Sequence, residues 1–166
     1  MDRRAFLSTL VAGGVVGASG CVGGGRVVLE RKRSVTVRPG RGWWEQLPAV
    51  DGNGALTLTV RADQPFDVYY FPDADDFAQY EAYVSGDEPD AMPSGHQSLS
   101  QTAVQQGNEY GVVEPDNGGR RSISPDDDHY LVVDHSNYGQ GVPVDEHGEP
   151  LQAFVDLEVI NKQLPI

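Results

Sequence analysis

The chain has 166 residues, of which 25 are acidic and 12 basic, so its net charge is -13 at neutral pH. The charge is unevenly divided: residues 1–41 hold eight basic and two acidic side chains (net +6), and residues 42–166 hold four and 23 (net -19). Such an acidic body excludes nucleic-acid binding by charge neutralisation, because phosphate binding depends on clustered Lys and Arg. The length and the 39% apolar content predict a single domain with its own core.

The first 21 residues have the pattern of an export signal. Arg3 and Arg4 precede an uncharged run over residues 5–20, which ends in small residues before Cys21. The run is too short and too rich in glycine for a membrane-spanning helix, which needs about 20 apolar residues. A soluble N-terminal helix is the alternative, and glycines in its interior would destabilise it.

Two motifs within this segment carry a resemblance to known signals. Residues 3–7 resemble the twin-arginine export signal, whose characteristic positions are held here by Arg3, Arg4, Phe6 and Leu7. Residues 18–21 resemble a lipobox, in which the cysteine, here Cys21, becomes the lipid-modified N-terminus. The resemblance implies a protein that folds before export and is anchored by lipid outside the cell membrane.

Cys21 is the only cysteine in the chain, which excludes an internal disulfide and a cysteine-rich metal site. The glycine-rich residues 22–25 that follow are expected to form a flexible tether. The domain is then expected to span residues 26–166.

A basic segment opens this domain. Residues 26–41 hold six basic residues and one acid, and two apolar triplets flank the charged centre. The segment is predicted to be a first β-strand, but contact with anionic lipid head groups is a second reading, compatible with the first if the charges are exposed. On the second reading, replacing Arg31, Lys32 and Arg33 with Gln would weaken binding of a lipid-free form to anionic vesicles.

The acidic body is also poor in lysine: the chain has 16 Asp and 9 Glu but only two Lys. A carboxylate-rich surface stays hydrated in concentrated salt, where like-charge repulsion is screened. The composition resembles that of proteins from extremely halophilic archaea. A merely acidic protein from an ordinary organism is the alternative.

Short segments with period-two alternation dominate the body, and turn residues separate them. Residues 56–61, for example, alternate apolar and polar side chains after a turn at 51–54. Strands are expected at 43–47, 56–61, 66–71, 97–106, 108–114, 129–134 and 152–160. With the basic strand, this predicts an all-β antiparallel sandwich or jelly roll of about seven or eight strands.

One short helix is predicted over residues 73–84. Asp73 is suited to the N-cap and Asp76 to the third helical position, and the apolar residues recur at helical spacing at Phe77, Tyr80 and Val84. Residues 87–95 are predicted to form a loop. A calcium site formed by the early acids is the alternative, but it lacks the glycine and late glutamate of an EF-hand.

Three segments of the body carry a family resemblance: 65–70, 129–137 and 154–159. Together they resemble a group of small secreted haloarchaeal lipoproteins and, more distantly, jelly-roll domains of the bacterial pre-peptidase C-terminal kind. The resemblance implies a β-sandwich without an assigned reaction, and it transfers no catalytic residue.

The residues suited to proton transfer are His96, His129, His135 and His147. His129 and His135 are expected on one face of one strand, too far apart to bind a single metal ion. The acid-rich groups at 126–129 and 145–147 have ligand-like composition but fall in turn-rich links. The local motifs of common hydrolases, zinc proteases and phosphate-binding loops are missing from the sequence, so we expect no catalytic residue, no cofactor and no metal site.

Trp43 and Trp44 are adjacent, so on a strand they point to opposite faces. Core packing of both is expected, with one ring in the sandwich and the other beneath the helix, and an exposed ring that stacks on a sugar or a partner chain is the alternative. The sequence therefore predicts a non-catalytic, lipid-anchored binding or structural module at the cell surface. Its expected partners are the membrane, through Cys21, and a surface protein or polysaccharide. The alternative is an accessory solute- or metal-binding lipoprotein of a membrane complex, with a pocket built from residues 87–97 and 135–150.

Overall fold

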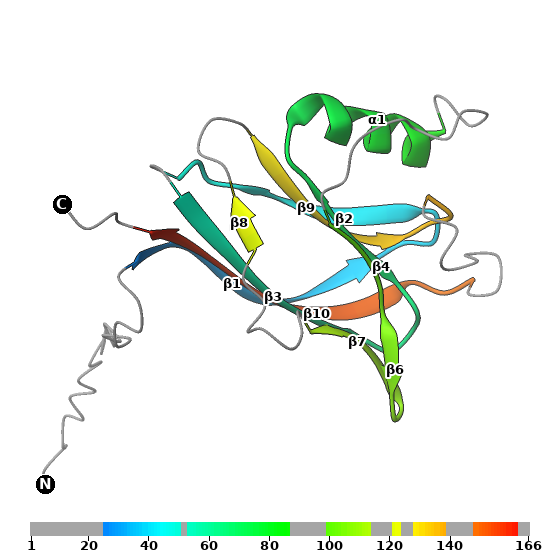
Figure 1. Cartoon of the computed structure of the whole chain (residues 1–166). Coiled ribbons are helices and arrows are strands. Elements are labelled where there is room, and N and C mark those ends of the chain that lie inside the picture. The colour runs from blue at the N-terminus through cyan, green and yellow to red at the C-terminus, as the bar shows by residue number, and fades with distance from the viewer. Residues whose placement is uncertain are drawn as a thin grey trace, which may run out of the picture.

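The protein is a sandwich of two antiparallel β-sheets, with a helix lying over the outer face of the smaller sheet (Figure 1). The expected all-β sandwich is therefore confirmed. The computed structural model describes residues 25–50, 53–86, 99–113, 121–123, 128–138 and 148–162.

The larger sheet has six strands, and its path runs β1-β10-β3-β7-β6, with β8 paired to β3 beside β7. Their bounds are β1 Gly25–Val37, β3 Asn53–Ala62, β6 Val104–Gln106, β7 Glu109–Val113, β8 Arg121–Ile123 and β10 Leu151–Lys162. The alternation that predicted these strands is visible in β10, where every second side chain from Leu151 to Val159 is buried.

The smaller sheet has four strands in the order β2-β9-β4-β5. Their bounds are β2 Arg41–Leu47, β4 Asp67–Phe71, β5 Leu99–Thr102 and β9 His129–His135. Every residue of β4 is buried, because the other sheet covers one face and the helix covers the other. This accounts for the nearly continuous apolar run from Val68 to Phe71.

The single strand predicted at 97–106 is wrong, since the chain changes sheets within it. β5 belongs to the smaller sheet and β6 to the larger, and Ala103 between them is buried. The Ala103 N–H donates to the Phe66 carbonyl at 2.9 Å, which satisfies the backbone at the crossing. Such corners are common where strands pass from one layer of a sandwich to the other. Residues 97–98 lie outside the described residues.

Helix α1, Ala74–Ser85, confirms the helix prediction. Asp73 is the N-cap, and its Oδ1 accepts a hydrogen bond from the Asp76 N–H at 2.8 Å. The helix ends at Gly86, whose φ of 86° is the left-handed conformation that favours glycine. Within the described ranges, no helix is long and apolar enough to cross a membrane. The loop predicted at 87–95 lies outside these ranges.

The described residues form two hydrophobic cores. The larger one fills the space between the sheets, where Val155, Leu157 and Val159 of β10 face Leu131 and Val133 of β9. The smaller one lies between α1 and the four-stranded sheet and consists mainly of aromatic rings: Tyr69, Phe71, Phe77, Tyr80, Val132 and Tyr138. The second core holds the helix in place over the sheet and so positions the surface described next.

Candidate binding groove

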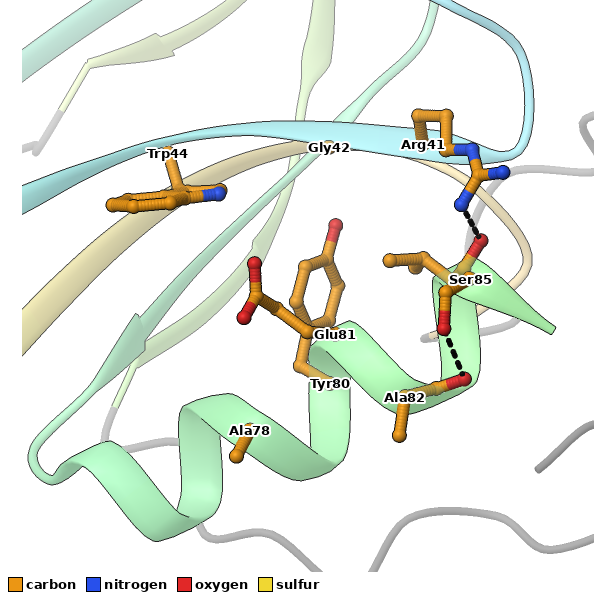
Figure 2. A pocket seen from close by; sticks show the side chains of 9 residues that line it. Arg41, Gly42, Trp44, Ala78, Tyr80, Glu81, Ala82 and Ser85 are labelled. Carbon is orange, nitrogen blue, oxygen red and sulfur yellow. Dashed lines mark hydrogen bonds between the residues drawn. The ribbon is translucent and has the colours of Figure 1, made fainter. Parts of the chain in front are cut away.

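A groove of about 530 Å³ runs between α1 and the edge strand β2 (Figure 2). Its lining comes from both elements: Arg41, Gly42, Trp44, Ala78, Tyr80, Glu81, Ala82, Val84 and Ser85. Its volume lies within the range of small-molecule sites in proteins.

Trp44 marks one end of the groove and is 43% exposed. Its ring packs edge-on against Phe77 at 5.2 Å and Tyr130 at 5.9 Å between centroids, which fixes its orientation. The adjacent Trp43 packs on the core between the sheets, so the two rings do point to opposite faces. Trp44 contacts α1 as expected, but its expected burial beneath the helix is wrong, because β2 is an edge strand and α1 leaves the outer side of the ring open to solvent.

The floor of the groove depends on a glycine. Gly42 of β2 is paired with Asp134 of β9, and the Tyr80 hydroxyl from α1 reaches the face of the sheet at the position that a Cβ on Gly42 would take. The Tyr80 hydroxyl donates to Asp134 Oδ1 at 2.5 Å. A Cβ at position 42 would overlap this hydroxyl and would approach Val132 Cγ1 at 2.9 Å. The missing side chain therefore lets the helix reach the buried carboxylate of the sheet.

Two charged side chains of opposite sign line the groove. Arg41 stands at the end away from Trp44, and its Nη1 donates to the Val84 carbonyl near the end of α1 at 2.6 Å. The Glu81 carboxylate projects from α1 toward β2 (Figure 2). The groove thus combines an aromatic ring with a carboxylate and a guanidinium, and the charges of the last two cancel.

Beneath the groove, Asp134 and Asp67 lie opposite each other on β9 and β4, and both are buried. Burial raises the pKa of Asp134 to about 7, although hydrogen bonds from Tyr80 and Ser136 favour its charged form. Burial also raises the pKa of Asp67. The sequence analysis did not predict the burial of either acid. For Asp134, the one sign in the sequence is its position directly after the apolar run Leu131–Val133. Asp134 is 1% exposed and is hydrogen-bonded to Tyr80 and Ser136.

The outer face of the six-stranded sheet carries a second hollow, of about 620 Å³. Phe154 of β10, which is 44% exposed, stands beside it with Ser34 and Arg61 directly opposite on the neighbouring strands. In the part of the chain that the structure describes, each side of the sandwich therefore presents one largely exposed aromatic side chain, Trp44 or Phe154, and the two are nearly equal in exposure.

The two histidines predicted to share a strand face do so, and both point into the sandwich. His129 Nδ1 lies 2.7 Å from the Tyr70 hydroxyl, and His135 Nε2 lies 3.2 Å from the Glu149 carbonyl. Among the described residues, no group of three or more His, Cys, Asp or Glu could hold a metal ion. His96, His147 and most of the two acid-rich groups lie outside the described ranges.

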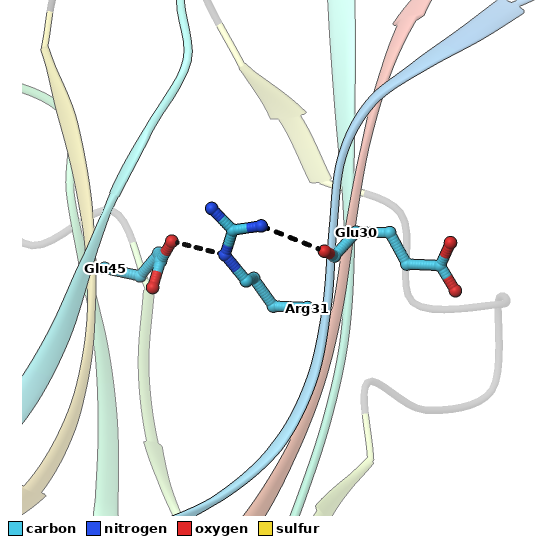
Figure 3. A network of polar contacts seen from close by, with 3 residues as sticks. All are labelled: Glu30, Arg31 and Glu45. Carbon is cyan, nitrogen blue, oxygen red and sulfur yellow. Dashed lines mark hydrogen bonds and ion pairs between the residues drawn. The ribbon is translucent and has the colours of Figure 1, made fainter.

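Most of the basic segment forms β1, as predicted, and three of its basic side chains contact other residues of the chain. Arg31 Nε pairs with Glu45 of β2 at 2.9 Å and its Nη1 donates to the Glu30 carbonyl (Figure 3). Lys32 pairs with Glu30 at 3.2 Å and with Asp156 at 3.7 Å. The Arg33 guanidinium lies 5.7 Å from the centre of the Trp43 ring. The contacts of Arg31 and Arg33 link the edge strands of the two sheets, whereas those of Lys32 lie within the larger sheet.

The proposed export and anchoring residues Arg3, Arg4, Phe6, Leu7 and Cys21 lie outside the described residues, as does most of the tether. Comparison of the sequence with protein-family models finds no matching family, and comparison with curated proteins finds no matching protein.

Proposed function

We propose that this chain is a non-catalytic binding module held by lipid on Cys21 at the outer face of a halophilic archaeon's cell membrane. The observation that carries the binding role is the α1–β2 groove with the exposed ring of Trp44 at its end. An exposed aromatic side chain beside a preformed hollow is typical of recognition sites. The anchoring half of the proposal rests on the motifs at residues 3–7 and 18–21.

The groups that face the groove are suited to binding. The ring of Trp44 offers an apolar surface, and Arg41 and Glu81 offer planar hydrogen-bonding groups. The acid with the strongly raised pKa, Asp134, is covered by Tyr80 and does not line the groove. The accessory solute-binding alternative is supported by the volume of the same groove.

The position of the groove along the sandwich fits an anchored module. β1 has 13 residues, so Gly25 and Val37 are about 40 Å apart along the strand. Arg41 follows Val37 after a short turn, and Trp43 lies beside Arg33 in the second half of β1. A tether at Gly25 would therefore leave the groove well away from the lipid surface and open to extracellular partners.

Two experiments test the two halves of the proposal. The full chain and its Cys21→Ser variant are expressed in a haloarchaeal host, and cells are fractionated in high salt. The expected result is membrane association only with Cys21; a variant that stays in the membrane fraction would overturn lipid anchoring. For binding, the anchored chain and its Trp44→Ala variant are cross-linked on intact cells, and loss of a defined adduct with the variant is expected. Identical adducts from both would remove the groove from the proposed function.

A further inference from the structure

We propose that the α1–β2 groove binds an uncharged saccharide, with one sugar ring stacked on Trp44. This inference rests on the proposed function, since it names the ligand of the same groove. Sugars present an apolar C–H face and a rim of hydroxyl groups, so they need an aromatic ring and planar hydrogen-bonding groups close together.

Trp44 is suited to the stacking contact. Phe77 and Tyr130 pack edge-on against its ring, at interplanar angles of 66° and 70°, while 43% of the residue stays exposed. The ring is therefore held in place before a ligand arrives, and little side-chain entropy is lost on binding. The exposed indole also carries an N–H that donates to hydroxyl groups.

The hydrogen-bonding groups lie along the groove from that ring. The Glu81 carboxylate accepts from neighbouring hydroxyls in a two-oxygen arrangement, and the Arg41 guanidinium keeps donors free after its bond to the Val84 carbonyl. Arg41 and Trp44 are three positions apart on β2, which is about 10 Å along a strand and matches roughly two sugar rings.

The charges of the groove favour an uncharged ligand. Arg41 and Glu81, which both line the groove, carry opposite charges that cancel each other. An acidic polysaccharide would bring its charge against Glu81, and a basic peptide would bring its charge against Arg41 at one end of the groove. A protein partner usually fills a larger apolar patch than one exposed ring provides.

The test is a pull-down assay with the full chain carrying Cys21→Ser, a substitution that removes the lipid and leaves the domain unchanged. The assay is run in about 3 M KCl to screen charge. The probes are insoluble cellulose, chitin, xylan and mannan, followed by fluorescence titration with the hexasaccharide of the polysaccharide that binds. In this background Trp44→Ala is expected to weaken binding on the order of tenfold or more, and Glu81→Ala several-fold. Glu81 is exposed, so its variant reports on binding even if Trp44→Ala loses stability.

Phe154→Ala is the matched control, since Phe154 is equally exposed but stands on the other sheet. Its binding is expected to equal that of the parent. Failure to bind all four polysaccharides, or an equal loss with Phe154→Ala, would overturn the saccharide assignment. If the sugars fail but a Trp44-dependent protein adduct forms on cells, the groove is a protein site and the proposed function stands without this ligand. If both fail, the binding function falls as well.

Discussion

The Tyr80 hydroxyl occupies the position at which a side chain on Gly42 would begin. Through that opening Tyr80 donates to Asp134 Oδ1, which joins the helix to the centre of the four-stranded sheet. The floor of the groove, the docking of α1 and the ionisation of a buried acid therefore depend on one small contact region.

Gly42→Ala is expected to destabilise the protein by about 2–4 kcal/mol, because the methyl group displaces Tyr80 and removes its hydrogen bond to Asp134, leaving only the bonds from Ser136. Denaturant unfolding in high salt measures the change in the free energy of unfolding. Gly148→Ala is the control, since a Cβ there meets no atom within 4 Å. Equal stability of the two variants would contradict the close approach of Tyr80 to β2.

Asp134→Asn is expected to change how stability depends on pH. Burial raises the folded-state pKa of Asp134 to about 7, above the ordinary aspartate value of 3.8, so the folded protein holds the proton more tightly. The contribution of protonated Asp134 to the free energy of unfolding is therefore fully present below about pH 4. It falls by roughly 4 kcal/mol as the pH rises to about 7. Unfolding curves of both proteins between these limits, at one salt concentration, should diverge as pH rises, with the variant the more stable. Parallel curves would show that Asp134 titrates normally.

Asp73→Ala is expected to cost about 1 kcal/mol of stability, because the N-cap hydrogen bond to the Asp76 N–H is lost. Asp75→Ala provides the comparison: it removes the same charge from the first turn, and Asp75 is exposed. Its cost should be a few tenths of a kcal/mol. Denaturant unfolding distinguishes the two, and a similar loss in both would assign the effect to charge at the helix end instead of capping.

The acidic body is expected to need salt. Lowering KCl from about 3 M to about 0.1 M lengthens the screening distance to about 10 Å and strengthens repulsion among the carboxylates. The unfolding temperature, followed by circular dichroism, should fall markedly at low salt. An unchanged unfolding temperature would argue against a halophilic origin.

The elements whose own periodicity sets their structure could be predicted from the sequence. The strand at residues 56–61 and helix α1 from Ala74 to Ser85 appear where alternation and capping place them. The crossing at Ala103 could not be predicted, because the pattern of residues 97–106 is that of one strand. Only the packing of the two sheets divides this segment into β5 and β6. β8 is too short, at three residues, for any periodicity to show.

The groove was less accessible to sequence reasoning than the fold. Adjacent tryptophans predict opposite faces, but only the edge position of β2 leaves Trp44 open. A glycine in a strand indicates close approach of some other group without naming it, so Gly42 could not be linked to Tyr80. The burial of Asp134 likewise depends on a helix that comes from a distant segment of the chain.

The pairing of β1 with β10 has a consequence for the timing of folding. β10 lies between β1 and β3, so the two earliest strands of the large sheet are joined only through one that is synthesised after all the other described strands. Until β10 has been synthesised, β1 has no partner strand in the larger sheet, and the backbone groups that will bond to β10 have no strand to pair with. The larger sheet can therefore be completed only after β10, Leu151–Lys162, has been synthesised, and a chain truncated before Leu151 would leave β1 without a partner strand in that sheet.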